Sequence, residues 1–313
     1  MGGFLATMVC RWLSEERIIN VSRIYPVMFE SIKRSWNIVA KSFGVLMSEK
    51  RLLVFPALSM LALIALLASF IVPVFIFDNS VLFFPLLFLF YFAAYFVAIF
   101  FNVALVHASG EKLEGRQVSL SGSVSFAFSK AVNIIGWALF SATVGLILGM
   151  MRSQSNSKGL GGIIIRIAAS IIGVAWSFAA FLVVPVMVFE NVGPLTALKR
   201  SVELLKSTWS EQAWGTFSIS GVVFLFYLPA IGLGILLLMM GQGTLLMFLL
   251  PMLLLYVALV FVLQGALEGI FTAELYKYAA TGKAVVFENE LSQGMIDKQA
   301  PIDAGTPKTE TQF

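Results

Sequence analysis

The sequence has little of the residue types that carry most catalytic and metal chemistry. Its 313 residues include one cysteine, Cys10, and one histidine, His107. A single cysteine excludes an internal disulfide and a thiolate metal cage, and a lone imidazole is weak support for a metal or acid–base site. The chain also has no glycine-rich phosphate loop and no nucleophile–base pattern. We therefore expect no cofactor, no metal and no catalytic residue, and we predict that the protein is not an enzyme.

Charged residues are scarce as well, and long apolar runs take their place. Only 12% of the residues are charged and 59% are apolar, with a mean hydropathy of +0.93, whereas about 25% charged is typical of a soluble domain. Six runs reach roughly the 20 residues that a helix needs to cross a hydrocarbon layer. The six runs are Leu52–Phe77, Val81–Val106, Ile134–Met151, Gly162–Phe189, Trp214–Met240 and Thr244–Phe271. The sequence thus predicts an integral membrane protein.

The cations are distributed unevenly between the connections of these runs. Eighteen of the 21 Lys and Arg residues fall in the two chain ends and in alternate connections, and only Arg152, Lys158 and Arg166 fall in the others. The positive-inside rule then predicts a multi-pass protein of a prokaryotic plasma membrane with both termini in the cytoplasm. Cations at that membrane edge meet anionic lipid headgroups. Membrane lipids, and not nucleic acid, are therefore the expected partners, and the sequence leaves protein partners unknown.

A short amphipathic pattern precedes each pair of apolar runs. Its first copy has an apolar stripe and a polar side that carries Lys33 and Arg34, which suits a helix lying in the headgroup region. The same 4-3-4 apolar spacing returns later with Lys199 and Arg200 at the matching offset, and a fainter copy carries Lys130. The apolar positions are Ile32, Trp36, Val39 and Phe43, then Val124, Phe128, Ala131 and Ile135, then Leu198, Val202, Leu205 and Trp209. We interpret the chain as a threefold repeat of helix plus hairpin.

The predicted fold is an all-α polytopic membrane helix bundle, with six transmembrane helices and three interfacial amphipathic helices. Residues 1–27 are expected to form a loosely ordered extension, 28–290 the six-helix membrane domain, and 291–313 a disordered tail with no apolar period. Gly193-Pro194 should begin the third amphipathic helix. Thr281-Gly282 should end the last helix.

The interfacial helices supply the first set of candidate functional residues. Their cations either anchor the helices to anionic lipid or hold a phosphate-bearing headgroup, and the spacing does not separate these two roles. The candidate headgroup contacts are Lys33, Arg34, Lys130, Lys199, Arg200 and Lys206. Trp36 and Trp209 are the expected interfacial anchors.

A second set of candidates lies inside the apolar runs. Ser141 and Ser177 belong to small-residue faces of the central hairpin, which are typical of tight helix packing and less often of a channel lining. Asn102 is a neutral polar residue near the inner end of its run, and Pro185 and Pro251 can break their helices. These five residues mark a candidate solute path. Glu268, one turn from Gln264, is expected at the interface, with a proton or cation site as the alternative.

Three stretches resemble an uncharacterised prokaryotic family of polytopic membrane proteins. They are GWALFSATVGLIL (Gly136–Leu148), AWSFAAFLVVPVMVFE (Ala175–Glu190) and GPLTALKRSVELLKSTWSEQ (Gly193–Gln212). The resemblance extends over about 28–290 and implies a membrane location without an assigned reaction. The helix-then-hairpin units are more distantly similar to the membrane domain attached to some glycerophosphodiester phosphodiesterases. This sequence lacks their catalytic domain, so that activity is not implied.

Three functions remain open on the sequence. The first is a non-enzymatic membrane scaffold or lipid-handling protein, whose basic helices grip the cytoplasmic leaflet. The second is a transporter or channel for a small solute, which a polar cavity reaching mid-membrane would favour and a closed apolar core would oppose. A membrane enzyme is the third, and it would need converging titratable groups that the chain scarcely has.

Overall fold

The computed structural model describes residues 36–76, 81–154, 160–240, 243–282 and 286. Within these ranges only the backbone is described for several stretches, the longest being 206–218. The predicted N-terminal extension (1–27) and C-terminal tail (291–313) lie outside the described residues, as do Lys33 and Arg34. The described part of the chain is helical and contains no strand.

The helices follow one another with short connections. A helix at 36–48 leads into the short 3-10 helix η1 (Lys50–Leu53). The remaining elements are α3 (Val54–Ile76), α4 (Phe83–Leu113), α5 (Leu120–Ser129), α6 (Ala131–Gln154), α7 (Leu160–Ala180), α8 (Val183–Phe189), α9 (Pro194–Met240) and α10 (Gly243–Thr281).

Among the described residues, five helical segments are long and apolar enough to cross a membrane. They are Lys50–Ile71, Phe83–Leu113, Ala131–Ser153, Gly162–Phe189 and Leu249–Thr281. The remaining predicted span, Trp214–Met240, lies within α9, where the described apolar segment Gly221–Leu236 is shorter. The all-α fold and a multi-pass membrane protein are therefore supported, while the count of six spans stays a prediction.

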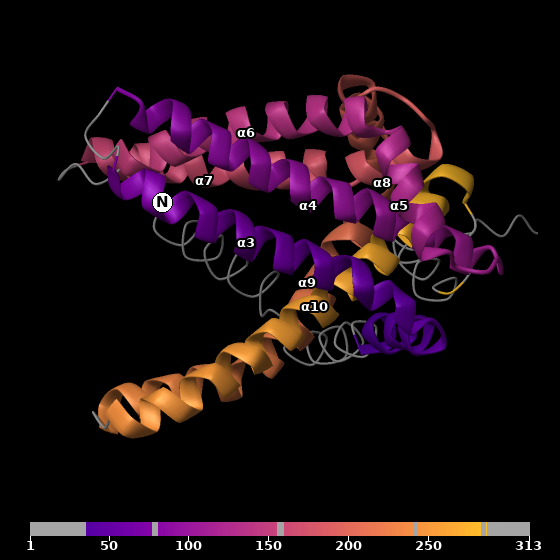
Figure 1. Cartoon of the computed structure of the whole chain (residues 1–313). Helices are drawn as coiled ribbons and strands as arrows, with labels where there is room; N and C mark the ends of the chain where they lie inside the picture. Colours follow the sequence, from indigo (N-terminus) through magenta and orange to yellow (C-terminus); the bar gives the residue numbers. More distant parts are fainter. Residues whose placement is uncertain (1–35, 77–80, 155–159, 241–242, 283–285, 287–313) are drawn as a thin grey trace, which may run out of the picture.

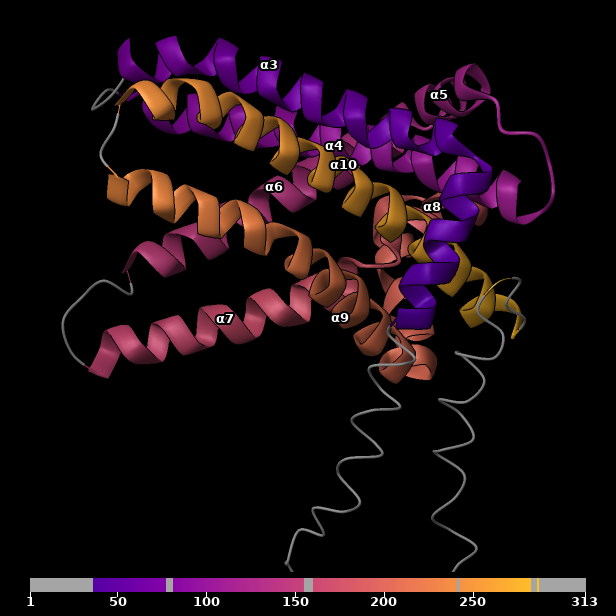
Figure 2. The ribbon, with the colours of Figure 1, turned by 90° about the horizontal axis from the view of Figure 1, so that it is seen from below.

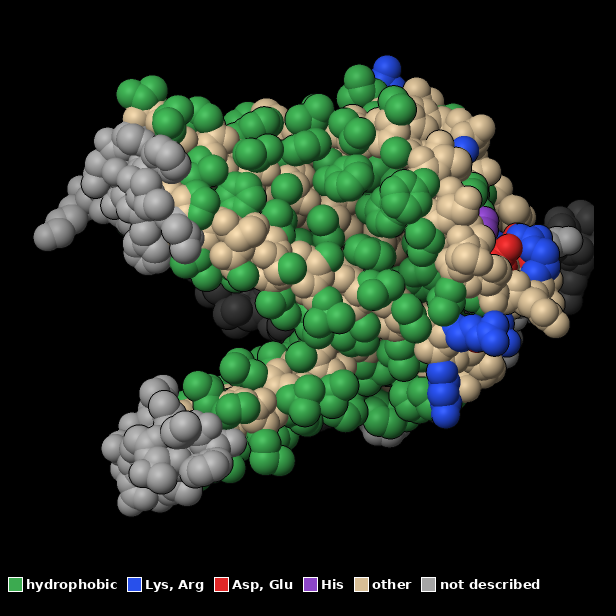
Figure 3. All heavy atoms as spheres, in the orientation of Figure 1, with side chains coloured by type: hydrophobic (Ala, Val, Ile, Leu, Met, Phe, Trp, Pro, Cys, Tyr) green, Lys and Arg blue, Asp and Glu red, His purple; other side chains and the backbone are tan. Residues whose placement is uncertain are grey.

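The outer surface of these helices is apolar along most of its length. Large apolar side chains are exposed on α3 (Leu61, Ile64), on α7 (Ile164, Ile171) and on α10 (Leu255). Figure 3 shows hydrophobic side chains along the helices, with Lys and Arg gathered at one end. Such a surface is unfavourable in water and suits a lipid environment, where apolar groups face acyl chains.

We call the end where these cations lie the basic end. It contains the C-terminal turns of α4 and α10 and the N-terminal turns of α6 and α9, because consecutive long helices run in opposite directions (Figures 1 and 2). Its described cations are Lys41, Lys50, Arg51, Lys112, Arg116, Lys130, Lys199, Arg200 and Lys277. The predicted gathering of cations on one flank therefore has a structural counterpart.

Helix α4 occupies the centre of the bundle and packs against α3, α6, α8 and α10. Its basic half is the most buried part of the core and includes Val103, Ala104 and Val106, all 0% exposed. Helices α9 and α10 form an antiparallel pair whose far tips diverge from the layer of α3, α4, α6 and α7 (Figures 1 and 2). The bundle is thus tight at the basic end and splayed at the opposite end.

Helix boundaries confirm some local predictions and correct others. Helix α9 begins at Pro194, and α10 ends at Thr281 before Gly282, whose φ of 71° favours glycine. The fainter amphipathic copy was wrong as a single helix, because α5 ends at Ser129 and its last two apolar positions belong to α6. The third amphipathic segment continues without a break into the rest of α9.

Candidate functional site

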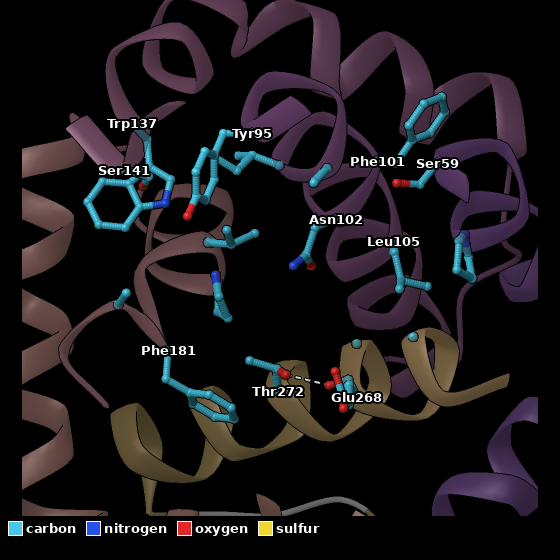
Figure 4. Close-up of a pocket in the computed structure, with 18 of the residues that line it drawn as sticks. Ser59, Tyr95, Phe101, Asn102, Leu105, Trp137, Ser141, Phe181, Glu268 and Thr272 are labelled. Atoms are coloured by element: carbon cyan, nitrogen blue, oxygen red, sulfur yellow. Dashed lines mark hydrogen bonds between the residues drawn. The ribbon is translucent and has the colours of Figure 1, made fainter. Parts of the chain in front are cut away.

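A cavity of about 410 Å³ opens within the membrane-spanning bundle, on the side toward the basic end. Helices α3, α4, α6, α7 and α10 line it, and the α7–α8 connection with Phe181 closes one end, which we call its floor; in Figure 4, α10 runs below the hollow and Phe181 lies at its lower left. Among its lining residues, Asn102, Ser177 and Glu268 are exposed, and Asn102 and Glu268 are so although their neighbours on α4 and α10 are buried. The cavity is therefore open to the surroundings and is not a sealed packing defect.

The polar groups of the cavity come from five different elements. Ser59 belongs to α3, Asn102 to α4, Ser141 to α6, Ser177 to α7, and Glu268 and Thr272 to α10. In Figure 4, Asn102 lies between two side chains of α10, Glu268 and Thr272, and a group formed by Tyr95, Trp137 and Ser141. The cavity thus joins an otherwise apolar lining to a few converging polar groups, as small-molecule sites do.

Glu268 is the one carboxylate among the described residues that line this cavity. Its Oε1 accepts a 2.8 Å hydrogen bond from Nε2 of Gln264, and the Gln264 Oε1 accepts in turn from the Tyr227 hydroxyl at 3.4 Å. Thr272 donates its hydroxyl to the backbone carbonyl of Glu268, not to the carboxylate. No Lys or Arg among the described residues forms an ion pair with Glu268. The local arrangement holds the carboxylate in place without neutralising it.

These polar groups lie well below the basic end. Lys277 marks that end on α10, and Glu268 lies nine residues earlier, roughly 13 Å along a helix that rises 1.5 Å per residue. Asn102 lies ten residues before Lys112 on α4, roughly 15 Å along the axis. Glu268 therefore lies in the cavity wall, beside the candidate solute path, and its expected interfacial position stays a prediction.

Aromatic side chains form the opposite wall. The rings of Trp137 on α6 and Trp176 on α7 stack with centroids 5.5 Å apart, and Phe140 contacts Trp176 at 5.6 Å. The Tyr95 hydroxyl of α4 lies 3.0 Å from the position that a Cβ on Gly145 would take. The small residues of α6 therefore accommodate α4 at this point, in addition to the central hairpin partner that the sequence suggested.

The floor of the cavity is a broken helix. The predicted fourth span is interrupted at Phe181 and Leu182, where α7 ends and α8 begins. Pro185 explains the position, because proline has no N–H to bond the carbonyl four residues earlier and its ring crowds that carbonyl. The buried Ser201 of α9 bridges the gap: its hydroxyl donates to the Ala179 carbonyl at 2.7 Å and accepts from the Leu182 N–H at 3.2 Å.

Two glycines let α10 approach closely enough to form the cavity wall. A Cβ on Gly265 would lie 3.1 Å from the Pro56 ring of α3, and a Cβ on Gly269 would overlap the buried Leu105 of α4. Neither of these glycines nor Ser201 was among the functional residues predicted from the sequence. The four-residue Gly–Gly spacing around Glu268 was a readable sign of close helix contact, whereas the bridge from Ser201 could not be read from local sequence.

The basic end holds a second group of charged residues, and these are paired. Arg200 Nε donates to Glu190 Oε1 at 3.1 Å, and the Tyr276 hydroxyl donates to the same oxygen at 3.1 Å. Lys277 bonds Glu114 at 2.9 Å and the Gly110 carbonyl at 3.2 Å. The hydrogen bond from Lys277 holds the pKa of Glu114 below its usual value. These contacts connect α10 to α4, α8 and α9.

The candidate headgroup residues have different surroundings. Lys199 is exposed, Lys130 donates to the Asn191 side chain, and Arg200 is engaged by Glu190 and by Glu203 at 3.4 Å. Trp36 is 59% exposed, as expected of an interfacial anchor. The side chains of Lys206 and Trp209 lie outside the described atoms. Contact with lipid stays a prediction for all of them.

Of the five candidate solute-path residues, Asn102, Ser141, Ser177 and Pro185 line one cavity, whereas Pro251 lies elsewhere on α10. The lone His107 has another role in packing. Its ring stacks on Phe126 with centroids 4.1 Å apart, and its Nδ1 lies 3.2 Å from the Ser123 hydroxyl, which attaches α5 to α4. No group of three or more potential metal ligands occurs among the described residues.

The geometry defines a helical membrane protein with a half-open internal cavity. The family profile described as "Family of unknown function (DUF6159)" matches residues 81–286, more than half of the chain, and the chain belongs to this family. The match agrees with the expected uncharacterised family, whose prokaryotic origin stays a prediction. No curated protein and no solved structure matches the chain. The comparisons give no link to glycerophosphodiester phosphodiesterases, so that distant resemblance also stays a prediction.

Proposed function

We propose that the protein is a non-enzymatic solute-handling membrane protein, which binds a small amphipathic molecule in the cavity and carries it between the basic end and the bilayer interior. The observation that carries this proposal is the convergence of Asn102, Ser141, Ser177 and Glu268 on one open cavity beside a broken helix. It favours the transporter alternative over a closed scaffold, because a protein that serves only as a scaffold has no need of polar groups facing a void at membrane depth.

The energetic cost of these groups supports the same conclusion. Polar and ionisable side chains within membrane spans are expensive and usually line a site or a pathway. Interrupted helices supply such sites in many transporters, because backbone freed from helical bonding is tolerated only where it is satisfied by protein or water. Here the Ser201 hydroxyl bonds two of the backbone groups beside the break, the Ala179 carbonyl and the Leu182 N–H. The cavity floor is thus stable without being a continuous helix.

We further propose that the basic end faces the cytoplasm of a prokaryotic cell, with both termini on that side and anionic lipids around it. The cavity would then be loaded from the cytoplasm or from the inner leaflet. The distribution of Lys and Arg carries this orientation. Fusion of a reporter to either terminus checks it, and an external position of both termini would contradict it.

Access of water to the cavity is the direct test of the function. In a Cys10→Ser background, Ser177→Cys places a thiol in the cavity wall. Because the thiolate is the reactive species and requires water, a small maleimide should label this position in native membranes. Ser69→Cys is the matched control, since Ser69 is also exposed and also bonds its own helix backbone, at 2.7 Å against 2.9 Å for Ser177. Ser69 does not line the cavity, and its thiol should stay unlabelled in lipid.

Equal labelling of the two positions would overturn the proposal. Failure to label Ser177→Cys and Asn102→Cys in folded protein would do the same, because it would mean a cavity closed to water. Labelling of both cavity positions that falls when a candidate solute is added would identify the ligand as well.

A second function, leaflet anchoring, rests on a separate observation. The helix at 36–48 exposes Trp36, Phe43 and Met47, and α5 exposes Phe128, at 41–64% of their surfaces. Amphipathic helices of this kind bind lipid through apolar area and through attraction to anionic headgroups. The full protein in nanodiscs should melt at a higher temperature in anionic than in neutral lipid, and Lys199→Gln should reduce the difference. Equal melting temperatures in both lipids would remove the electrostatic part.

A further inference from the structure

The charge of the cavity indicates which class of solute it takes, provided that the cavity is a binding site as proposed above. Among the described residues that line the cavity, Glu268 contributes the one carboxylate, and none is Lys or Arg. The carboxylate accepts a hydrogen bond from the neutral amide of Gln264. An anionic solute would meet a like charge in a region of low dielectric, where repulsion is strong. A neutral solute would leave the carboxylate without a counter-ion.

The aromatic wall opposite Glu268 also favours a cation. Figure 4 places Tyr95 and Trp137 across the hollow from Glu268, and Phe181 beside Thr272. Trp137 and Trp176 add a stacked pair to this wall. Aromatic faces carry partial negative charge and attract ammonium-type groups, with a larger gain where the cation has lost its water. Together, the carboxylate and the rings offer two independent attractions for the same ligand charge.

The remaining lining restricts the rest of the ligand. Most lining side chains are apolar, including Leu105, Phe261 and Val184, and the volume of about 410 Å³ is at the small end of ligand sites. The hydroxyls and the amide are few and do not form a continuous polar track. The site therefore matches a small molecule with an apolar body and a single positive charge.

We infer that the cavity binds hydrophobic organic cations, with Glu268 as the counter-ion and the aromatic wall as the second recognition element. The bound cation neutralises the carboxylate at membrane depth, which makes binding favourable where a neutral molecule of the same shape gains only apolar contact. Two sources share this chemistry: a free lipophilic cation, or the ammonium headgroup of a membrane lipid.

The test uses the full protein in a mild non-ionic detergent and measures ligand-dependent shifts in melting temperature, which follow from binding to the folded state. Tetraphenylphosphonium is the cationic probe, and triphenylphosphine oxide is the neutral control. Diheptanoylphosphatidylcholine tests the lipid source. Wild-type protein should be stabilised by tetraphenylphosphonium at concentrations at least tenfold lower than those of the neutral control. Stabilisation by the phosphatidylcholine as well would identify a lipid headgroup as a source, and its absence would identify a free solute.

Glu268→Gln separates charge from shape. Glutamine has nearly the shape of glutamate and the charge of a protonated carboxyl, so it keeps the hydrogen bond to Gln264 and removes only the ionised oxygen. This variant should bind tetraphenylphosphonium at least tenfold more weakly and the neutral control unchanged. Glu203→Gln is the matched control, because it removes a negative charge from an exposed position of α9 outside the cavity, and it should bind like wild type.

Three outcomes would overturn the inference. One is equal stabilisation of wild type by the cationic and the neutral probe. Another is unchanged cation binding by folded Glu268→Gln, which would mean that the carboxyl is not the counter-ion. The third is no stabilisation by any probe. The labelling of Ser177→Cys then distinguishes the two proposals: a labelled cavity leaves the solute-handling function in place without cation selection, and an unlabelled one removes both.

Discussion

The basic end and the cavity use glutamate in opposite ways, although both sites contact α10. At the basic end, Glu190 accepts from Arg200 and from Tyr276, both at 3.1 Å, so its charge is matched within the protein. In the cavity, Glu268 has a neutral amide at 2.8 Å and no described cation. The difference shows that the chain can pair a carboxylate completely where the fold must be held together. Glu268 on α10 has no cation partner among the described residues, as expected if the charge is matched by a molecule from outside, in line with the binding site proposed above.

The close contact of α10 with α4 is the feature on which both sites depend, and its loss should have the largest effect. In Gly269→Ala, the new Cβ overlaps Leu105, which is only 4% exposed and cannot swing into solvent. Overpacking should lower the free energy of unfolding by about 3 kcal/mol and displace Glu268 from the cavity wall. Gly232→Ala is the matched control, because nothing lies within 4 Å of its new Cβ, and it should be neutral or stabilising. Thermal unfolding of the two variants checks the difference, and similar losses would refute the proposed contact.

The bridge from α9 to the broken helix should give the next largest effect. Ser201→Ala leaves the Leu182 N–H and the Ala179 carbonyl without the hydroxyl that now bonds both. We expect a loss of about 2 kcal/mol, the cost of unsatisfied buried polar groups. Ser177→Ala removes a hydroxyl that bonds only its own helix and should change stability by less than about 0.5 kcal/mol. Melting curves of both variants measure this, and a stable Ser201→Ala would contradict the bridging role.

The comparison of the two glutamates can be tested with one substitution made at each. Glu190→Gln should lower the free energy of unfolding by about 1–2 kcal/mol, because it weakens charge-assisted bonds to Arg200 and Tyr276 at a partly exposed position. Glu268→Gln should raise the melting temperature of the ligand-free protein, because it removes an unmatched charge at membrane depth. Opposite signs in the same melting assay support the comparison. A loss of stability in both variants would mean that Glu268 is a structural residue.

The smallest effect should come from pH at the basic end. Because Lys277 lowers the pKa of Glu114 in the folded protein, the pair contributes stability above the ordinary pKa of glutamate, and this contribution is lost as the pH falls through the lowered value. Glu114 is 40% exposed, so the contribution should stay under about 1 kcal/mol. Melting temperatures from neutral pH to about pH 3 should fall slightly less in Lys277→Gln than in wild type. Parallel curves would exclude the contribution of this pair.

The sequence predicts the helices well because their causes are local. Apolar runs of sufficient length, Pro194 at a helix start and Gly282 after a helix end all act through neighbouring residues. Four of the five suggested path residues also line the cavity, since polar groups and proline are unusual enough in apolar runs to be noticed one by one. What could not be predicted is how these residues converge on one cavity. Glu268 and Asn102 line the same cavity because Gly269 fits against Leu105. The break before Pro185 is bridged by Ser201 of α9, 19 residues after Leu182.

Helix α9 gives the molecule a mechanical connection. It runs for 47 residues, roughly 70 Å at 1.5 Å per residue, and it carries Ser201 near one end and the divergent tip at the other. Pro229 is the proline inside this helix and lies between the two ends. The hydroxyl that closes the break and the tip that reaches furthest from it therefore belong to one continuous element, so the cavity floor and the far end of the bundle share a single backbone.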